Sequence, residues 1–151
     1  MEEEHGWTLG DPPQSMPVPP SAPDDAEIVT FGTEPYALRG VRDIVKRYAL
    51  KVGLSAEGAD DLVMAVNEVA TNSLAHGGGS GTVLLWIDGG FLVCEVRDRG
   101  RMPSQRRPGR HRPGLEQLGG RGLWMAGQLC DLVRIRTSST GTSVRLHKRL
   151  P

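Results

Sequence analysis

Two apolar segments joined by a glycine turn set the strongest constraint on the fold of this chain. Thr82–Ile87 and Phe91–Arg97 are rich in β-branched and other large apolar residues, and Asp88-Gly89-Gly90 stands between them. Adjacent glycines supply the positive φ angles that a tight hairpin turn requires, so the pattern predicts two neighbouring antiparallel strands. Any fold for this chain therefore has to contain an antiparallel sheet.

Two helices are expected before this hairpin. Glu34–Gly53 repeats apolar residues at helical spacing, with Pro35 in its first turn, and a second helix is expected from Ser55, a favourable N-cap, to the glycines that begin at Gly77. The other expected elements are three short strands and a short buried helix, in the segments Ala26–Gly32, Gly122–Asp131, Leu132–Thr137 and Thr142–Lys148. This order predicts an α+β fold, a two-layer α/β sandwich with helices on one face of a mostly antiparallel, mixed sheet.

Acidic residues and prolines are concentrated at the N-terminus. Residues 1–30 hold seven of the 18 acids, six of the 11 prolines and no Lys or Arg, so the rest of the chain carries 18 basic against 11 acidic side chains. Such a composition offers little apolar surface to offset the entropy of ordering the backbone. We therefore expect a disordered acidic tail over residues 1–25 and one folded domain over residues 26–150.

Targeting and membrane signals are not found in the sequence. No segment approaches the ~20 apolar residues of a membrane span, and the acidic N-terminus lacks the basic and apolar regions of a secretory signal. Cys94 and Cys130 lie in apolar segments without metal-ligand spacing, which favours reduced, buried thiols. We expect a cytoplasmic protein with no membrane partner.

Three polar residues recur at four-residue spacing on the second predicted helix. Glu68, Asn72 and His76 therefore form one row along the helix. The Asn72 amide oxygen is a suitable ligand for Mg²⁺, and the Glu68 carboxylate can accept a proton from an attacking hydroxyl. Taken alone, such a row is more often a solvated helix face.

Three further features follow in order along the chain. Asp98-Arg99-Gly100 comes directly after a predicted strand, where the carboxylate can accept a hydrogen bond from an amine and the glycine allows close approach. Gly119-Gly120-Arg121-Gly122 opens a predicted helix, whose N-terminal N–H groups attract an anion. Gly141-Thr142 opens the last predicted strand. Each has an ordinary structural explanation as well: a turn, a hinge and a hairpin.

The four features together resemble the GHKL ATP-binding fold, also called the Bergerat fold. NEVATNSLAHG resembles its N box, DRG and GGRGLWMAG its two glycine boxes, and GTSVRL its closing segment, and the resemblance covers Ile28–Leu146. Within this superfamily, VRDIVKRYALKVGLSAE, ATNSLAHG and GGRGLWMA are typical of the anti-sigma factor serine kinases.

The resemblance implies a role for each site residue. Glu68 is the expected catalytic base, Asn72 the expected Mg²⁺ ligand, and Asp98 the expected partner of adenine. The remaining expected contacts to ATP are His76, Gly100, Gly120, Arg121, Gly122, Leu123 and Thr142. Arginines of the predicted lid between the glycine boxes are expected to help neutralise the triphosphate: Arg101, Arg106, Arg107, Arg110 and Arg112.

The function implied is that of an ATP-dependent serine-protein kinase that sequesters a sigma factor and phosphorylates an anti-anti-sigma (STAS-type) partner. Relatives of this kind commonly form homodimers. An alternative is a nucleotide-switched binding module without phosphotransfer, since the Arg99–Gly120 segment is more basic and richer in proline than is usual in the family. A nucleic-acid binder ranks last, because the basic segment has no aromatic residue for base stacking.

Overall fold

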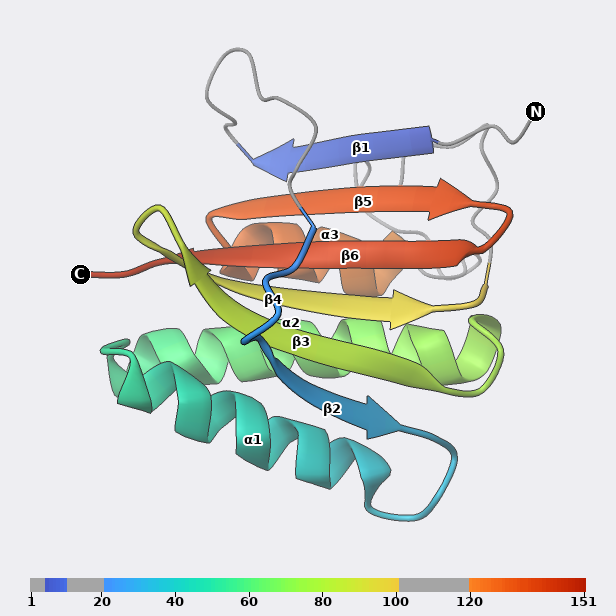
Figure 1. Ribbon diagram of the computed structural model, residues 1–151, viewed down its shortest axis with the longest axis horizontal. Coiled ribbons are helices and arrows are strands. Elements are labelled where there is room, and N and C mark those ends of the chain that lie inside the picture. The colour runs from blue at the N-terminus through green and yellow to red at the C-terminus, as the bar shows by residue number, and fades with distance from the viewer. Residues whose placement is uncertain (1–4, 11–20, 101–119) are drawn as a thin grey trace.

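The computed structural model describes residues 5–10, 21–100 and 120–151 and shows three helices and six strands in these ranges (Figure 1). In chain order the elements are β1 (His5–Gly10), β2 (Glu27–Phe31), α1 (Ala37–Lys51), α2 (Ala56–His76), β3 (Gly81–Asp88), β4 (Phe91–Asp98), α3 (Gly120–Leu129), β5 (Leu132–Ser138) and β6 (Gly141–Arg149). No helix in the described ranges has the length and apolar character needed to cross a membrane.

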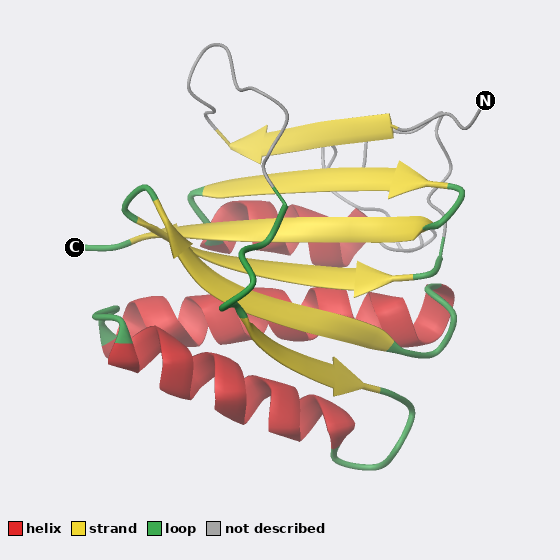
Figure 2. Cartoon of the chain, viewed as in Figure 1, coloured by secondary structure: helices red, strands yellow, loops and turns green. Residues whose placement is uncertain are grey.

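The strands form a single sheet in the order β1-β5-β6-β4-β3-β2, and the three helices cover one face of it (Figure 2). This arrangement confirms the expected two-layer α+β fold. All five strand pairings are antiparallel, so the parallel pairing expected of a mixed sheet is absent among the described strands.

The turn between β3 and β4 confirms the predicted hairpin. Asp88 pairs with Phe91, and the two glycines between them have φ angles of 55° and 86°, the positive values required at both central positions of a type I′ turn. The register continues into β6, where Asp98 pairs with Thr142. Two of the expected site residues are thereby placed side by side at the same end of the sheet.

The two long helices begin differently. Ser55 caps α2 as expected, because its side-chain oxygen accepts a hydrogen bond from the Gly58 N–H at 3.0 Å. At α1 the prediction that Pro35 lies in the first helical turn is wrong: the helix begins at Ala37, after Tyr36, whose φ of 72° is left-handed. A residue with that φ cannot belong to a right-handed helix, so Pro35 is part of the preceding loop.

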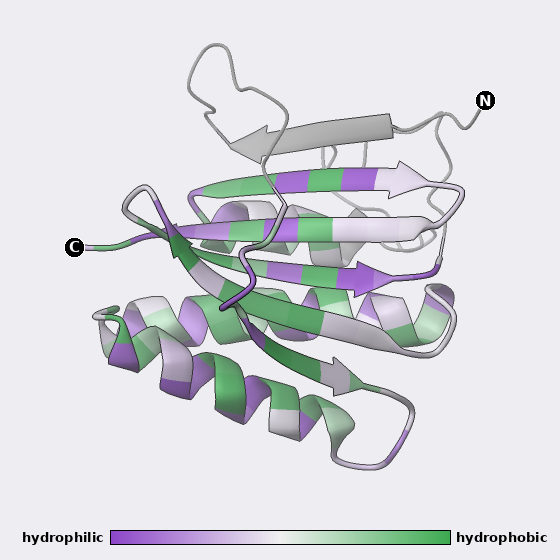
Figure 3. Ribbon diagram, viewed as in Figure 1, coloured by the Kyte–Doolittle hydropathy of each residue, from purple (hydrophilic) through white to green (hydrophobic). Residues whose placement is uncertain are grey.

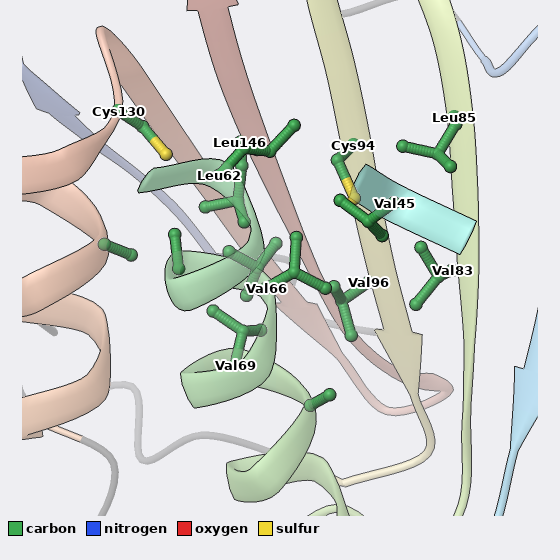
Figure 4. Packing of buried hydrophobic residues seen from close by; sticks show 14 of the residues in the cluster. Val45, Leu62, Val66, Val69, Val83, Leu85, Cys94, Val96, Cys130 and Leu146 are labelled. Atoms are coloured by element: carbon green, nitrogen blue, oxygen red, sulfur yellow. The ribbon is translucent and has the colours of Figure 1, made fainter. Parts of the chain in front are cut away.

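The main core lies between the helices and the sheet. Leu62, Val66 and Val69 on α2 pack in one cluster with apolar residues from the covered face of the sheet, among them Val83, Leu85, Cys94, Val96 and Leu146 (Figure 4). Polar and apolar residues alternate along β5 and β6, whereas β3 carries an unbroken apolar run (Figure 3). Cys94 and Cys130 are free and buried, and burial raises the pKa of the Cys130 thiol to about 12.

The N-terminal region differs from the expected disordered tail. His5–Gly10 forms β1, which pairs with β5 along its whole length, so the prediction of disorder through residue 25 is wrong for these six residues. Composition indicates only how much side-chain surface a segment can bury, whereas an edge strand offers unpaired main-chain groups to any extended segment. Residues 1–4 and 11–20 lie outside the described residues.

The other face of the sheet carries a second, smaller cluster. Leu84, Trp86 and Val93 are buried there beneath Ala22 and Ala26, which belong to the segment that leads into β2. Figure 1 shows this segment in front of the sheet, on the side away from the helices.

A buried ion pair continues this face toward β6. Glu95 lies between Arg97 and Arg145 and forms an ion pair with each. The Arg145 guanidinium also lies 5.1 Å from the centre of the Trp86 ring, a distance at which a cation is attracted to the aromatic face.

His147 provides a test of this face. It is buried, and its Nε2 has no hydrogen-bond partner within the described part of the chain. Burial, followed by the charges of Arg134 and Arg145, lowers the pKa of His147 from 6.5 to about 4. Between these values the unfolded chain binds a proton that the folded chain does not, so stability falls as pH decreases.

We predict that the wild-type protein loses more stability than His147→Gln as pH falls from about 6.5 to about 4, where the His147 proton is taken up on unfolding. Urea denaturation of both proteins across this range measures the difference, and the other titrating groups cancel in the comparison. Parallel stability curves for the two proteins would show that His147 is not held in its neutral form.

Candidate functional site

Four segments that are distant in sequence meet at one end of the sheet. They are the C-terminal half of α2, the turn that follows β4, the start of β6 and the start of α3. The close contacts among them involve glycines, at positions where a side chain would collide with the neighbouring segment. The four sequence features are therefore brought together in space.

Asp98 lies at the centre of this meeting point. Its Oδ2 accepts a hydrogen bond from the Ser73 hydroxyl at 2.7 Å, and its Oδ1 accepts one from the Gly100 N–H at 2.7 Å. Burial raises the pKa of the Asp98 carboxyl, and the two hydrogen bonds offset that rise only in part. The result is a fixed, half-buried carboxylate with lone pairs left to accept a further hydrogen bond.

The end of α2 lies directly against the turn after β4. A Cβ on Gly100 would stand 2.5 Å from the Gly77 Cα and 2.8 Å from the His76 carbonyl oxygen. Only glycine allows two backbones to approach this closely. The His76 side chain itself is exposed, so at this junction His76 contributes its main-chain carbonyl.

Thr142 secures the same turn from the side of β6. Its hydroxyl donates a hydrogen bond to the Gly100 carbonyl oxygen at 2.7 Å and lies 3.0 Å from the Thr137 hydroxyl on β5. Thr142 is buried. It therefore holds the Asp-x-Gly turn in place from the sheet side, as Ser73 does from the helix side.

The polar row on α2 faces the start of α3. A Cβ on Gly122 would lie 2.7 Å from the Asn72 amide nitrogen and 3.5 Å from the Glu68 Cβ. Both polar residues are half-buried, so this part of the row is not a fully solvated helix face. The N-terminus of α3, whose first N–H groups have no partner within the helix, thus begins beside a carboxylate and an amide.

The remaining residues expected to contact ATP lie in different surroundings. Gly120 and Arg121 begin α3. The Leu123 side chain is only 1% exposed and belongs to the core, which leaves just its main-chain N–H for a ligand. The side chain of Arg121 and the lid arginines lie outside the described residues; the latter are Arg101, Arg106, Arg107, Arg110 and Arg112.

Ser73 is a site residue that the sequence reasoning missed. It is 2% exposed and donates to Asp98 from the buried face of α2. A signal for it was present, because Ser73 continues the apolar row of Val66 and Val69 at helical spacing, where a buried hydroxyl needs a hydrogen-bond partner.

The donor set beside Gly122 fits a magnesium ion. Mg²⁺ prefers oxygen ligands and is usually held by one or two protein groups together with waters and substrate phosphates. Asn72 and Glu68 supply an amide oxygen and a carboxylate one helical turn apart. Within the described ranges there is no group of three or more His, Cys, Asp or Glu residues that could hold a metal by themselves.

The domain as a whole has relatives among known proteins. Residues 31–148 match the family described as the histidine kinase-like ATPase domain. No curated protein matches the chain. Among solved structures, the chain is similar to the crystal structure of the RsbU and RsbW domains of Rv1364c from Mycobacterium tuberculosis, with a TM-score of 0.61 and 25% sequence identity. The similarity covers 85% of this chain but only 33% of that one.

We predict that Gly122→Ala does not give the stabilisation of about 0.5–1 kcal/mol that Ala normally brings to a helix, because the added methyl group has to displace the Asn72 amide. Gly40→Ala is the matched control. A Cβ on Gly40 has nothing within 4 Å, so this change in α1 should stabilise by about 0.5–1 kcal/mol. Urea unfolding measures both, and equal effects of the two substitutions would contradict the contact.

Proposed function

The chain belongs to the family of histidine kinase-like ATPase domains, and from that membership we propose that it binds ATP with Mg²⁺ where α2, α3, β4 and β6 meet. The observation that carries this proposal is the Asp98 carboxylate, which Ser73 and Gly100 hold at 2.7 Å each. A fixed acceptor of this kind suits the exocyclic amine of adenine, and Gly100 leaves room for the ring.

The phosphates are assigned to the start of α3. The N–H groups of its first turn and its positive dipole end attract an anion, and Gly120 and Gly122 present no side chain in front of them. Asn72, which a Cβ on Gly122 would touch, would supply an oxygen to Mg²⁺. When bound, the ion neutralises phosphate charge.

Glu68 is proposed as the general base for transfer to a serine of a partner protein. It lies one turn from Asn72 on α2, beside Gly122. As the serine oxygen bonds to the γ-phosphorus, Glu68 takes the hydroxyl proton and the bond from that phosphorus to the ADP oxygen breaks. Most of the rate acceleration in such a transfer comes from positioning and charge neutralisation.

The biological role we propose is control of transcription by partner exchange. The solved relative contains RsbU and RsbW domains in one chain, which supports partners of the regulatory type. In this proposal the protein sequesters a sigma factor until an anti-anti-sigma (STAS-type) protein displaces it. Homodimer formation and a cytoplasmic location remain predictions.

A second candidate is a nucleotide-switched binding module without phosphotransfer. The segment Arg99–Gly120 is expected to close over the nucleotide, and it is more basic and richer in proline than is usual in the family. This unusual composition favours nucleotide binding without phosphotransfer. Both candidates require ATP at the same site and differ only in the role of Glu68.

We predict that Asn72→Ala removes most of the Mg²⁺-dependent part of the affinity for ATP, a loss of about tenfold or more, because a metal ligand is removed. Calorimetry with ATP, with and without Mg²⁺, measures this. Asn67→Ala is the control: Asn67 lies on the same helix but accepts a hydrogen bond from Arg42 at 2.9 Å. A magnesium effect that survives in Asn72→Ala would exclude the assigned ligand.

We predict that Glu68→Gln still binds Mg·ATP but transfers phosphate to the partner at least about 100-fold more slowly, since loss of a general base typically costs this much. Labelled ATP and the purified partner give the rate. Glu57→Gln, an exposed change in the first turn of α2, should transfer at the wild-type rate. Unchanged transfer by Glu68→Gln refutes the base, and no transfer by the wild type favours the switched module.

A further inference from the structure

The strand β1 lies outside the part of the chain that matches the family. The match begins at residue 31, whereas β1 covers His5–Gly10 and pairs with β5 from His5 opposite Thr137 to Gly10 opposite Leu132. It is the outermost strand of the sheet, at the edge opposite β2 (Figure 1). Without β1, the outer main-chain groups of β5 would be unpaired.

The attachment of β1 is weak by construction. It has six residues and only one neighbouring strand, and two of the six residues are glycines. Glycine in a strand contributes no side-chain packing and loses the most backbone entropy on ordering. Short edge strands of this kind open locally at a low free-energy cost compared with central strands.

The edge that β1 covers carries excess positive charge. β5 contains Arg134 and Arg136 and no acid, and Arg134 pairs in register with Arg145 of β6. The acid nearest to Arg145 is Glu95, which Arg97 shares. Like charges opposite one another destabilise a sheet.

Arg134 is only partly compensated, by the charge of Asp88. Its Nε is buried and has no hydrogen-bond partner among the described residues. Burial, followed by the charges of Arg145 and Arg136, lowers the pKa of Arg134. An added strand that brings negative charge would offset the repulsion and the cost of desolvation.

The sequence around β1 has the complementary charge. Glu2, Glu3 and Glu4 directly precede the strand, and Asp11 directly follows it. The segment paired with β5 is thus a short extended peptide with acids covalently attached at both ends. Main-chain pairing provides the affinity in strand addition, and flanking charges provide the selectivity.

We propose that the outer edge of β5 is a strand-addition site for an extended acidic segment of a partner protein. In the absence of the partner, β1 of the same chain occupies this site and competes with the partner segment for it. The partner segment takes the place of β1, pairs with Leu132–Ser138 and carries acids that face the arginines of β5. The strand-addition site uses the outer main-chain edge of β5 and does not require nucleotide binding, although it approaches the proposed ATP site at Thr137, whose hydroxyl lies 3.0 Å from that of Thr142.

The test uses the full-length chain with Trp7→Pro and Thr8→Pro together. Because successive N–H groups of a strand point in opposite directions, one of the two prolines removes a group directed at β5 in either register. We expect β1 to detach while circular dichroism shows the remaining fold intact. Alternate amides of Leu132–Ser138, measured by hydrogen exchange, should lose protection relative to those of β3.

The freed edge should then bind a labelled peptide with the sequence of residues 1–12. The wild-type protein, whose edge is occupied, should bind this peptide at least about tenfold more weakly, as expected for competition with a tethered strand. A matched peptide with Glu2, Glu3, Glu4 and Asp11 changed to their amides should also bind at least about tenfold more weakly, and added salt should reduce this difference. Arg134→Gln in the double-proline chain should also reduce the difference in affinity between the acidic and the neutral peptide.

Three results would overturn the proposal. One is full protection of the β5 amides in the double-proline chain, and another is equal binding of the acidic and neutral peptides. The third is a wild-type dimer, seen by sedimentation, that the two prolines abolish, because it would assign the edge to β1 of a second copy.

Discussion

The paired hydrogen bonds on Asp98 are the constraint on which the rest of the site depends. Ser73 donates from α2 and the Gly100 N–H donates from the turn after β4, so one carboxylate ties the helical layer to the end of the sheet. The junction closes only because glycines allow the two backbones to touch, and Thr142 holds the Gly100 carbonyl from β6. The burial that creates this arrangement also raises the pKa of Asp98, so the two hydrogen bonds are what favours its charged form.

The fold followed from local sequence signals to a large extent. The glycine pair after Asp88 predicted the central hairpin, and the Ser55 cap predicted the start of α2, because both depend on the conformations of a few neighbouring residues. The resemblance to the GHKL fold and its anti-sigma factor kinase branch is supported by the family match and the solved relative. The roles assigned to Glu68 and Asn72 are still predictions.

What the sequence left undetermined depends on contacts between distant segments. The disordered tail was the wrong expectation for His5–Gly10, since pairing with β5 uses main-chain groups that composition does not report. Ser73 was missed because its partner, Asp98, is 25 residues away. Leu123 was expected among the ligand contacts, and its side chain lies in the core. A contact through its main-chain N–H stays a prediction, because a helix start that offers its N–H groups to a ligand still buries its apolar face.

The central claim is that four segments enclose a single nucleotide. Mapping backbone amide chemical shifts during titration with Mg·ATP tests it most directly, since every segment has its own reporters. If one nucleotide contacts all four segments, the largest shifts occur together, at one saturating concentration, in Asn72–Ser73, Asp98–Gly100, Gly120–Gly122 and Gly141–Thr142. Shifts confined to one of these segments, or spread over the far end of the sheet near Gly89-Gly90, would contradict it.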